Sequence, residues 1–222
     1  MDGVSQGVRA AVLIDGGYYD RLKGVLGRPD VDIVRLSNKL CGDVPRLRTY
    51  YFDALPWVGS PPDLRDLDRQ RKKQSYLDTI KLQDRMELRL GHLQRLKVEC
   101  PMCRTPIVNC PHCNATMVKF QQKLVDVKLS VEMVRLAWSG QARLLVLLSG
   151  DSDFVPAVQA AKDAGAVVRL AHASRDAGPT VRVHDELLKI CDERVVLDGN
   201  WVSDTLRLSP LTNPQQPPRA QP

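Results

Sequence analysis

Residues 143–156 read RLLVLLSGDSDFVP, and this stretch decides the fold class of the 222-residue chain. An arginine is followed by five aliphatic residues and then by Ser-Gly-Asp-Ser-Asp. A short aliphatic run that stops at glycine and acidic residues is typical of a strand buried in a parallel sheet. The helical pattern of residues 154–164, closed by Gly165, predicts a helix directly after this turn.

The same arrangement recurs on both sides of this stretch. Residues 8–14 (VRAAVLI) form a second near-continuous apolar run, which ends at Asp-Gly-Gly. Further strands are expected at 48–52, 166–171 and 195–197, and further helices at 32–40, 125–138 and 181–191. Strands that alternate with helices predict an α/β fold with a mainly parallel central sheet.

The remaining segments carry weaker signals. Residues 64–90 contain no proline or glycine and predict a long charged helix that turns to a strand near 88–98. Two apolar stripes along 125–138 predict a helix that is buried over a broad face. No internal repeat is recognisable, and the Pro, Gln and Asn content of residues 209–222 predicts a disordered tail.

Composition excludes several classes of protein. Apolar residues make up 43% of the chain, which is enough for the core of one globular domain. No aliphatic run approaches the roughly 20 residues of a membrane helix, and Asp15 cuts short the apolar stretch near the N-terminus. Six cysteines without a signal sequence do not indicate a disulfide framework, so a reducing, cytoplasmic location is expected. The net charge of +6 favours a polyanionic partner.

Four aspartates stand where expected strands end or helices begin: Asp15, Asp126, Asp151 and Asp153. The carboxyl ends of parallel strands share one edge of the sheet, and such sheets bind their ligands there. Carboxylates held close together repel one another, and a divalent cation such as Mg²⁺ or Mn²⁺ offsets that repulsion. Each aspartate also has a structural interpretation as a helix cap or turn residue, and the spacing leaves both interpretations open.

Three segments and their spacing resemble the NYN domain, in particular the LabA-like branch of the PIN-like nuclease superfamily. They are 12–16 (VLIDG), 123–127 (KLVDV) and 147–156 (LLSGDSDFVP), and GAVV follows at 165–168. The resemblance covers about residues 8–198, apart from a cluster of cysteines. It implies a PIN-like three-layer α/β sandwich with a mainly parallel central sheet, and a metal-dependent ribonuclease activity.

The resemblance also implies roles for individual residues. The carboxylates that would hold Mg²⁺ or Mn²⁺ fall on Asp15, Asp126, Asp151 and Asp153. Ser149 and Ser152 would orient these carboxylates or water. Cleavage of an RNA phosphodiester would leave a 5′-phosphate and a 3′-hydroxyl. One position departs from the family pattern, because Gly17-Tyr18-Tyr19 replaces the asparagine that commonly follows the first Asp-Gly.

The cysteine cluster consists of two C-P-x-C motifs, whose cysteines are Cys100, Cys103, Cys110 and Cys113. Four thiolates at this spacing suit a tetrahedral Zn²⁺ site. Four protein ligands leave no open position for chemistry, so a structural zinc knuckle is expected. The alternative is two redox-active pairs, although neither pair follows a strand–helix turn of the thioredoxin type. Cys41 and Cys191 stand alone and are expected to pack in the core.

Basic residues are concentrated before the cysteine cluster. Residues 65–97 contain ten Lys or Arg and five Asp or Glu. The residues expected to contact RNA phosphates are Arg69, Arg71, Lys72, Lys73 and Lys123. A solvated helix with internal ion pairs is the alternative. Three aromatic residues expected in loops, which are Tyr18, Tyr19 and Trp57, are candidates either for stacking on unpaired bases or for core packing.

Together these features predict a metal-dependent endoribonuclease that acts on single-stranded or loop regions of RNA. The domain would span 1–208, with a basic, zinc-binding insertion at 60–118. The alternative is a catalytically silent RNA-binding or scaffolding module that uses the zinc knuckle and the basic helix. A nucleotide-binding enzyme is disfavoured because Asp15-Gly16-Gly17 lacks the spaced glycines that a pyrophosphate requires. Assembly into a homo-oligomer, or with a regulatory protein, stays open.

Overall fold

The computed structural model describes residues 7–59, 61–114, 116–117 and 119–207. Within these ranges the strands are β1 (Ala10–Asp15), β2 (Arg46–Ala54), β3 (Met86–Leu96), β4 (Lys119–Lys123), β5 (Leu144–Leu148), β6 (Val167–Ala173) and β7 (Glu193–Leu197). The helices are α1 (Gly16–Val25), α2 (Ile33–Cys41), α3 (Leu64–Lys81), α4 (Val125–Trp138), α5 (Val155–Asp163), α6 (Asp185–Ile190) and α7 (Gly199–Ser203). Short 3₁₀ helices are η1 (Ser152–Phe154), η2 (Arg175–Ala177) and η3 (Pro179–Val181).

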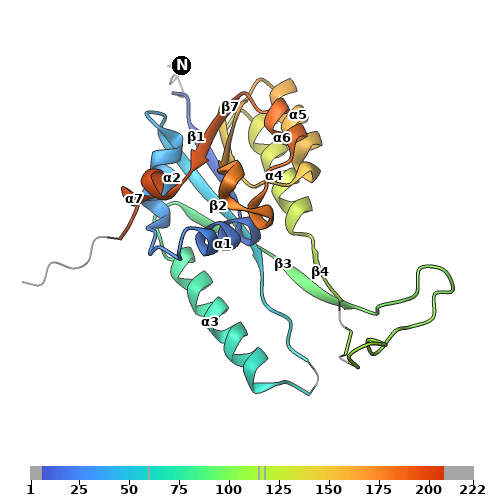
Figure 1. Ribbon diagram of the computed structural model, residues 1–222. Helices are drawn as coiled ribbons and strands as arrows, with labels where there is room; N and C mark the ends of the chain where they lie inside the picture. The colour runs from blue at the N-terminus through green and yellow to red at the C-terminus, as the bar shows by residue number, and fades with distance from the viewer. Residues whose placement is uncertain (1–6, 60, 115, 118, 208–222) are drawn as a thin grey trace, which may run out of the picture.

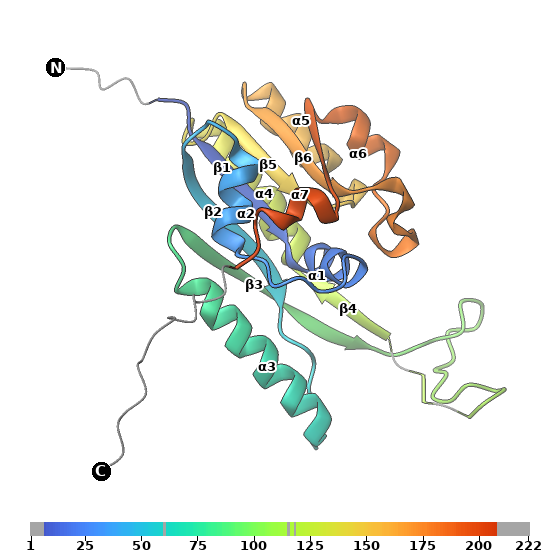
Figure 2. The same ribbon diagram turned by 60° about the vertical axis from the view of Figure 1, so that its left-hand side comes forward.

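The strands form one sheet that helices cover on both faces, which gives three layers (Figures 1 and 2). α4, α5 and α6 pack on one face, and α1, α2, α3 and α7 pack on the other. Alternate residues of β1 belong to opposite cores, with Leu13 on the side of α4 and Val12 on the side of α1 and α2. A strand buried on both faces must be apolar throughout, as the sequence of β1 is. The predicted α/β fold with a mainly parallel sheet is confirmed.

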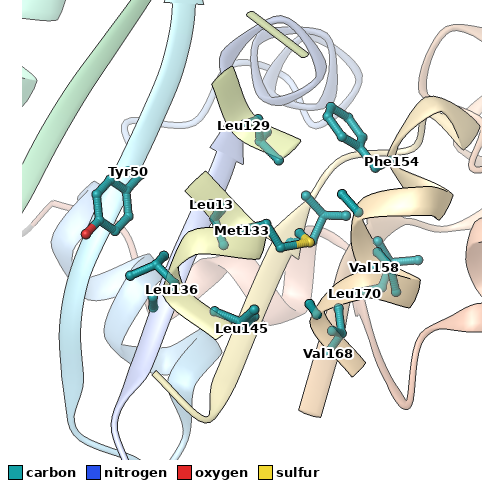
Figure 3. Close-up of a cluster of buried hydrophobic side chains, with 14 of the residues drawn as sticks. Leu13, Tyr50, Leu129, Met133, Leu136, Leu145, Phe154, Val158, Val168 and Leu170 are labelled. Carbon is teal, nitrogen blue, oxygen red and sulfur yellow. The ribbon is translucent and has the colours of Figure 1, made fainter. Parts of the chain in front are cut away.

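One core joins the sheet to α4 and α5 (Figure 3). Leu129, Met133 and Leu136 of α4 are completely buried there, as is Val158 of α5. Burying each side chain of this size stabilises the fold by about 1.5–3 kcal/mol. This packing fixes α4, and therefore the position of Asp126 in its first turn, relative to the sheet.

The strand order is β4-β3-β2-β1-β5-β6-β7, and β1 lies at the point where the direction of winding reverses. From β1 the chain proceeds outward to β2 and β3, and it later returns to β5 on the other side of β1. Open α/β sheets bind ligands beyond the carboxyl ends of the strands at such a reversal. Asp15 ends β1 and Ser149 directly follows β5 at this point.

A helix without a clear sequence signal, α1, begins directly after β1. Asp15 caps it by accepting a hydrogen bond from the Tyr18 amide. The prediction that Tyr18 and Tyr19 lie in loops is wrong, because both lie on α1 and are only 2% and 3% exposed. The Tyr18 hydroxyl donates to the Val181 carbonyl and accepts from the Ala173 amide. Neither ring is therefore available to stack on a base.

The long charged segment turns from helix to strand earlier than predicted. α3 ends at Lys81 and β3 begins at Met86, because Arg85 adopts a left-handed conformation with φ of 55°. Glycine or asparagine usually marks such a turn, so an arginine there leaves no sequence signature. β3 runs parallel to β2 as far as Gly91, which makes it, with α3, part of the main sheet and its helical cover.

Beyond Gly91, β3 leaves β2 and pairs antiparallel with β4, from His92 opposite Lys123 to Leu96 opposite Lys119. We call this pair of strands, residues 92–96 and 119–123, the β3–β4 arm. It projects from the carboxyl edge of the sheet, and the cysteine cluster lies at its far end (Figure 2). The N-terminal part of α3 extends from the sheet in the same general direction (Figures 1 and 2).

Only one of the two apolar stripes of α4 is buried, so the prediction of a broad buried face is wrong. The stripe that contains Leu129 and Met133 faces the sheet. In the other stripe, Val127, Val131 and Trp138 are 58%, 61% and 68% exposed. α4 packs on the sheet and on α5, and the side turned away from both faces solvent.

The C-terminal part of the chain differs from the sequence prediction in the length of one helix. The helix predicted at 181–191 is shorter, because η3 precedes α6 and α6 spans only Asp185–Ile190. No helix in the described ranges combines the length and the apolar character needed to cross a membrane. The predicted disordered tail at 209–222 lies outside the described residues.

Candidate active site

Asp15 is the most buried of the predicted site carboxylates, with 8% of its surface exposed. Its Oδ1 accepts the Tyr18 amide at 3.1 Å, and its Oδ2 accepts the Ser149 hydroxyl at 3.0 Å. Burial raises the pKa of Asp15, and these hydrogen bonds and the positive charge of Arg21 partly oppose that rise. The Ser149 hydroxyl thus links the end of β5 to the end of β1 at the reversal of the strand order.

Asp126 lies in the first turn of α4, within range of the charges of the other three predicted aspartates. Burial raises the pKa of Asp126, and the negative charges of Asp15, Asp151 and Asp153 raise it further. Carboxylates from three separate segments therefore lie near enough to one another at the carboxyl edge of the sheet for their charges to act on Asp126. We call Asp15, Asp126, Asp151 and Asp153 the acidic cluster.

Asp151 and Asp153 follow β5 and are both exposed. Asp151 caps η1 by accepting the Asp153 amide at 3.0 Å, while its own amide donates to Ser149 Oγ at 3.4 Å. The capping interpretation therefore applies to Asp15 and Asp151. In each case the cap uses Oδ1 alone, so capping does not preclude a second role. Ser152 lines a separate hollow beside the start of α6.

The described residues offer the acidic cluster no direct ion pair. In the described part of the chain, none of its four carboxylates forms an ion pair with a lysine or arginine. Its oxygen donors are of the kind that Mg²⁺ and Mn²⁺ prefer. Among the described residues, however, no three His, Cys, Asp or Glu side chains form a group that could hold a metal ion. Because Mg²⁺ keeps several water ligands and needs only one or two carboxylates, the donor set still fits such an ion.

A further carboxylate at this edge, Asp53 near the end of β2, was not among the predicted site residues. It is 4% exposed, and a Cβ added at Gly16 would lie 2.4 Å from its Oδ2, so it packs against the turn that follows Asp15. The Nζ of Lys73 on α3 lies 2.6 Å from the same oxygen, which has no hydrogen bond to any described group. The available sequence signal was its place at the end of a strand next to β1.

Several charges of α3 are already neutralised within the protein. The ion pairs are Arg69–Asp66, Lys72–Asp68 and Lys73–Asp53. Arg69 and Lys72 keep largely exposed side chains, at 67% and 76%, and can still face a polyanion. Lys73 is only 22% exposed and points to a buried partner, so its predicted contact with RNA phosphates does not fit its position. Arg71 and Lys123 form no ion pair with any described acidic residue.

The cysteine cluster forms two matching turns. Residues 98–107 (VECPMCRTPI) and 108–117 (VNCPHCNATM) align along their whole length, so the expectation that the chain holds no internal repeat is wrong. The Arg104 amide donates to the Cys100 carbonyl at 2.8 Å, and the Asn114 amide donates to the Cys110 carbonyl at 2.9 Å. Both closing residues are left-handed, with φ of 58° and 54°. The two C-P-x-C motifs are therefore built as equivalent knuckles.

Two of the four knuckle thiols, those of Cys103 and Cys110, have lowered pKa values, but the four are not assembled into one site. Hydrogen bonding to Thr105 lowers the pKa of Cys103 to about 7, and backbone hydrogen bonding at Cys113 lowers the pKa of Cys110. The four sulfurs do not form a metal-binding group in the described residues. The expected core positions of Cys41 and Cys191 are confirmed, since both are buried.

Comparison with known proteins identifies the family. The sequence model of the NYN domain family matches residues 9–198. This range includes every described strand and all described helices except α7. A crystal structure of a protein of unknown function from Vibrio parahaemolyticus shares the fold, with a TM-score of 0.51 and 15% identity over 93% of this chain and 100% of that chain. No curated protein matches the chain. NYN domains belong to the PIN-like nuclease superfamily, whose members generally use divalent metal ions. By the extent of the match and by its fold, this chain belongs to the NYN domain family.

Proposed function

We propose that this NYN domain is a metal-dependent endoribonuclease of the LabA-like branch that hydrolyses single-stranded or loop regions of RNA. The observation that carries the proposal is the acidic cluster, in which Asp126 experiences the negative charges of Asp15, Asp151 and Asp153. None of the four carboxylates forms an ion pair with a described lysine or arginine. Such an arrangement at the reversal of an α/β sheet is costly unless a cation offsets it. Membership of the NYN family supports nuclease activity and RNA as the class of substrate.

The residues of the acidic cluster would have different roles at the site. When bound to the acidic cluster, Mg²⁺ or Mn²⁺ would supply Lewis-acid activation of water and of the scissile phosphate. Asp15 is the rigid member, because the Tyr18 amide and the Ser149 hydroxyl hold both of its oxygens. Asp126 and Asp151 are more exposed and are free to move toward a cation. Segment 60–118 would supply RNA-binding surfaces to a domain that spans 1–208.

The proposal is tested by incubating the purified chain with end-labelled single-stranded RNA, or with DNA of the same sequence, in Mn²⁺, Mg²⁺ or EDTA. We expect cleavage of RNA with either metal, none in EDTA, and products that carry a 5′-phosphate. Asp151→Asn is expected to lower the cleavage rate by about a hundredfold or more. Asp163→Asn is the matched control. Asp163 lies at the far end of α5, and among the described residues its side chain accepts a hydrogen bond from Gln159 alone.

Binding of RNA without cleavage in any metal would contradict the nuclease proposal. Equal RNA affinities of the wild type and Asp151→Asn, measured in EDTA, would then favour the silent RNA-binding or scaffolding module. Loss of cleavage in both Asp151→Asn and Asp163→Asn would point to a general effect of the substitutions rather than to the acidic cluster.

We further propose that one structural Zn²⁺ joins the two knuckles through Cys100, Cys103, Cys110 and Cys113. The equivalent backbone closure of the knuckles supports this, since tetrahedral zinc sites are commonly built from two such pairs. The protein purified from zinc-containing medium is expected to carry one zinc per chain by mass spectrometry of the metal content. Cys103→Ser combined with Cys113→Ser should remove nearly all of it, whereas Cys41→Ala should retain it. Zinc-free wild-type protein, or full zinc content in the double variant, would contradict the site.

A further inference from the structure

An arginine and two aromatic rings gather at the β3–β4 arm. The ring centroids of Trp57 and Phe120 lie 5.3 Å apart at an interplanar angle of 43°, and the Arg95 guanidinium lies 5.4 Å from the centre of the Trp57 ring. Arg95 and Phe120 are directly opposite in the antiparallel ladder, so they project from the same face of the arm. We call Trp57, Arg95 and Phe120 the stacking platform.

The stacking platform lies outside the hydrophobic interior. Phe120 is 46% exposed, Arg95 is exposed, and Trp57 is half-buried. Neither ring belongs to either of the two described cores. β4 is an edge strand, and folded proteins usually keep large apolar side chains off such edges because they promote association. Open aromatic faces beside a guanidinium instead suit a ligand that is flat and negatively charged.

The surroundings of the platform are basic and lead to the acidic cluster. β3 and β4 together contain four Lys or Arg and a single glutamate. From Phe120 to Lys123, the end of β4, the chain advances by about 10 Å. It then passes through Leu124 into the first turn of α4, where Asp126 lies. A nucleic acid strand seated on the platform therefore reaches the acidic cluster within a few nucleotides.

We propose that the stacking platform binds one or two unpaired nucleotides of the RNA substrate, with bases stacked on Trp57 or Phe120 and a neighbouring phosphate held by Arg95. This inference rests on the proposed function and specifies how the substrate is selected. The faces of a base in a duplex are covered by its neighbours, so an aromatic platform favours single strands. Every base has a π face, so the platform does not select among sequences.

The test measures binding in EDTA, so that it does not depend on cleavage. Trp57→Ala and Phe120→Ala are each expected to weaken the binding of a short fluorescent single-stranded RNA by about tenfold. Binding of a blunt RNA duplex of the same length should change little. Trp57→Phe keeps an aromatic ring and should retain most of the affinity. A thermal unfolding curve for each variant separates a loss of stacking from a loss of folded protein.

Trp201→Ala is the matched control. The Lys39 ammonium lies 4.3 Å from the centre of the Trp201 ring, so this site also pairs a cation with an aromatic ring. Trp201 lies on α7, which follows β7 at the opposite edge of the sheet. Its replacement should leave RNA binding unchanged. Equal losses of affinity in Trp57→Ala and Trp201→Ala would overturn the proposal.

Direct stacking has a spectroscopic signature. The chain contains three tryptophans, so Trp138→Phe combined with Trp201→Phe leaves Trp57 as the single emitter. Single-stranded RNA is expected to quench its fluorescence, and RNA made of abasic nucleotides is expected to do so much less. Unchanged affinity of both alanine variants, or no quenching on binding, would overturn the platform even if RNA is cleaved. Quenching and weakened binding without cleavage in any metal would support the platform and count against the nuclease.

Discussion

Replacement of Asp15 by asparagine is expected to lower the rate of RNA cleavage by about a thousandfold while the protein stays folded. Asparagine caps helices as well as aspartate does, so the start of α1 should persist. The variant lacks the negative charge of the most buried carboxylate of the acidic cluster, which we propose attracts the divalent cation. A thousandfold loss corresponds to about 4 kcal/mol in barrier height, which is within the contribution of a catalytic metal. The measurement is single-turnover cleavage of labelled RNA in Mn²⁺.

The same variant is expected to be at least as stable as the wild type in EDTA. Burial raises the pKa of Asp15, so the folded protein takes up a proton there at a higher pH than the unfolded chain does. The ionised carboxylate therefore costs stability at neutral pH. This cost shrinks as the pH falls below the raised pKa and is gone below the ordinary pKa of an aspartate. Any difference in melting temperature between variant and wild type should thus narrow from neutral to acidic pH. Mn²⁺ should raise the melting temperature of the wild type alone.

Asp32→Asn is the matched control for Asp15→Asn. Asp32 caps α2 with φ and ψ of −75° and 108°, nearly the values of Asp15, which are −72° and 106°. Its carboxylate accepts the Val34 and Arg35 amides and lies outside the acidic cluster. Cleavage should therefore be unaffected. Wild-type cleavage by Asp15→Asn, or an equal loss in both variants, would refute the specific role of Asp15.

Lys73→Met is expected to lower the free energy of unfolding by about 3–5 kcal/mol, because it leaves the buried carboxylate of Asp53 without a positively charged partner. Asp53 is 4% exposed, and its Oδ2 has only the Lys73 ammonium as a close partner among the described groups. Methionine keeps the length and apolar packing of the lysine stem, so the change isolates the charge. Guanidinium denaturation followed by circular dichroism measures the effect.

Lys72→Met is the control for charge removal from the same helix. Lys72 pairs with Asp68 through side chains that are 76% and 60% exposed, so its loss should cost less than about 1 kcal/mol. Addition of Asp53→Asn to Lys73→Met should recover much of the stability, because no unpaired charge then remains buried. If Lys73→Met lowered the free energy of unfolding no more than Lys72→Met does, the buried ion pair would not stabilise the packing of α3 on the sheet.

The Asp53–Lys73 pair also changes how the basic helix must be tested. A triple replacement of Arg71, Lys72 and Lys73 by glutamine would mix weakened RNA binding with loss of stability. Arg71 and Lys72 are exposed and can be replaced without disturbing the buried pair. A weaker salt dependence of RNA binding in this double variant would then report on phosphate contacts alone.

The sequence by itself determined the fold class, the family and the segments that carry the acidic cluster. β1 and β5 are buried on both faces, and a strand in that position must be apolar throughout, so the run of aliphatic residues marks it locally. The aspartates that follow these strands meet at one edge because parallel strands align their carboxyl ends. The match to the NYN domain over residues 9–198 confirms the family resemblance.

Only the tertiary structure decided which side chains are partners and which faces are covered. Asp53 and Lys73 meet across β2 and α3, and Trp57 meets Phe120 across a long stretch of sequence. The second stripe of α4 is as apolar as the first, yet Val127 and Val131 are exposed because the sheet and α5 cover only one side. Burial and ion pairing depend on which elements pack together, and residues distant in the sequence carry no local pattern that reveals it.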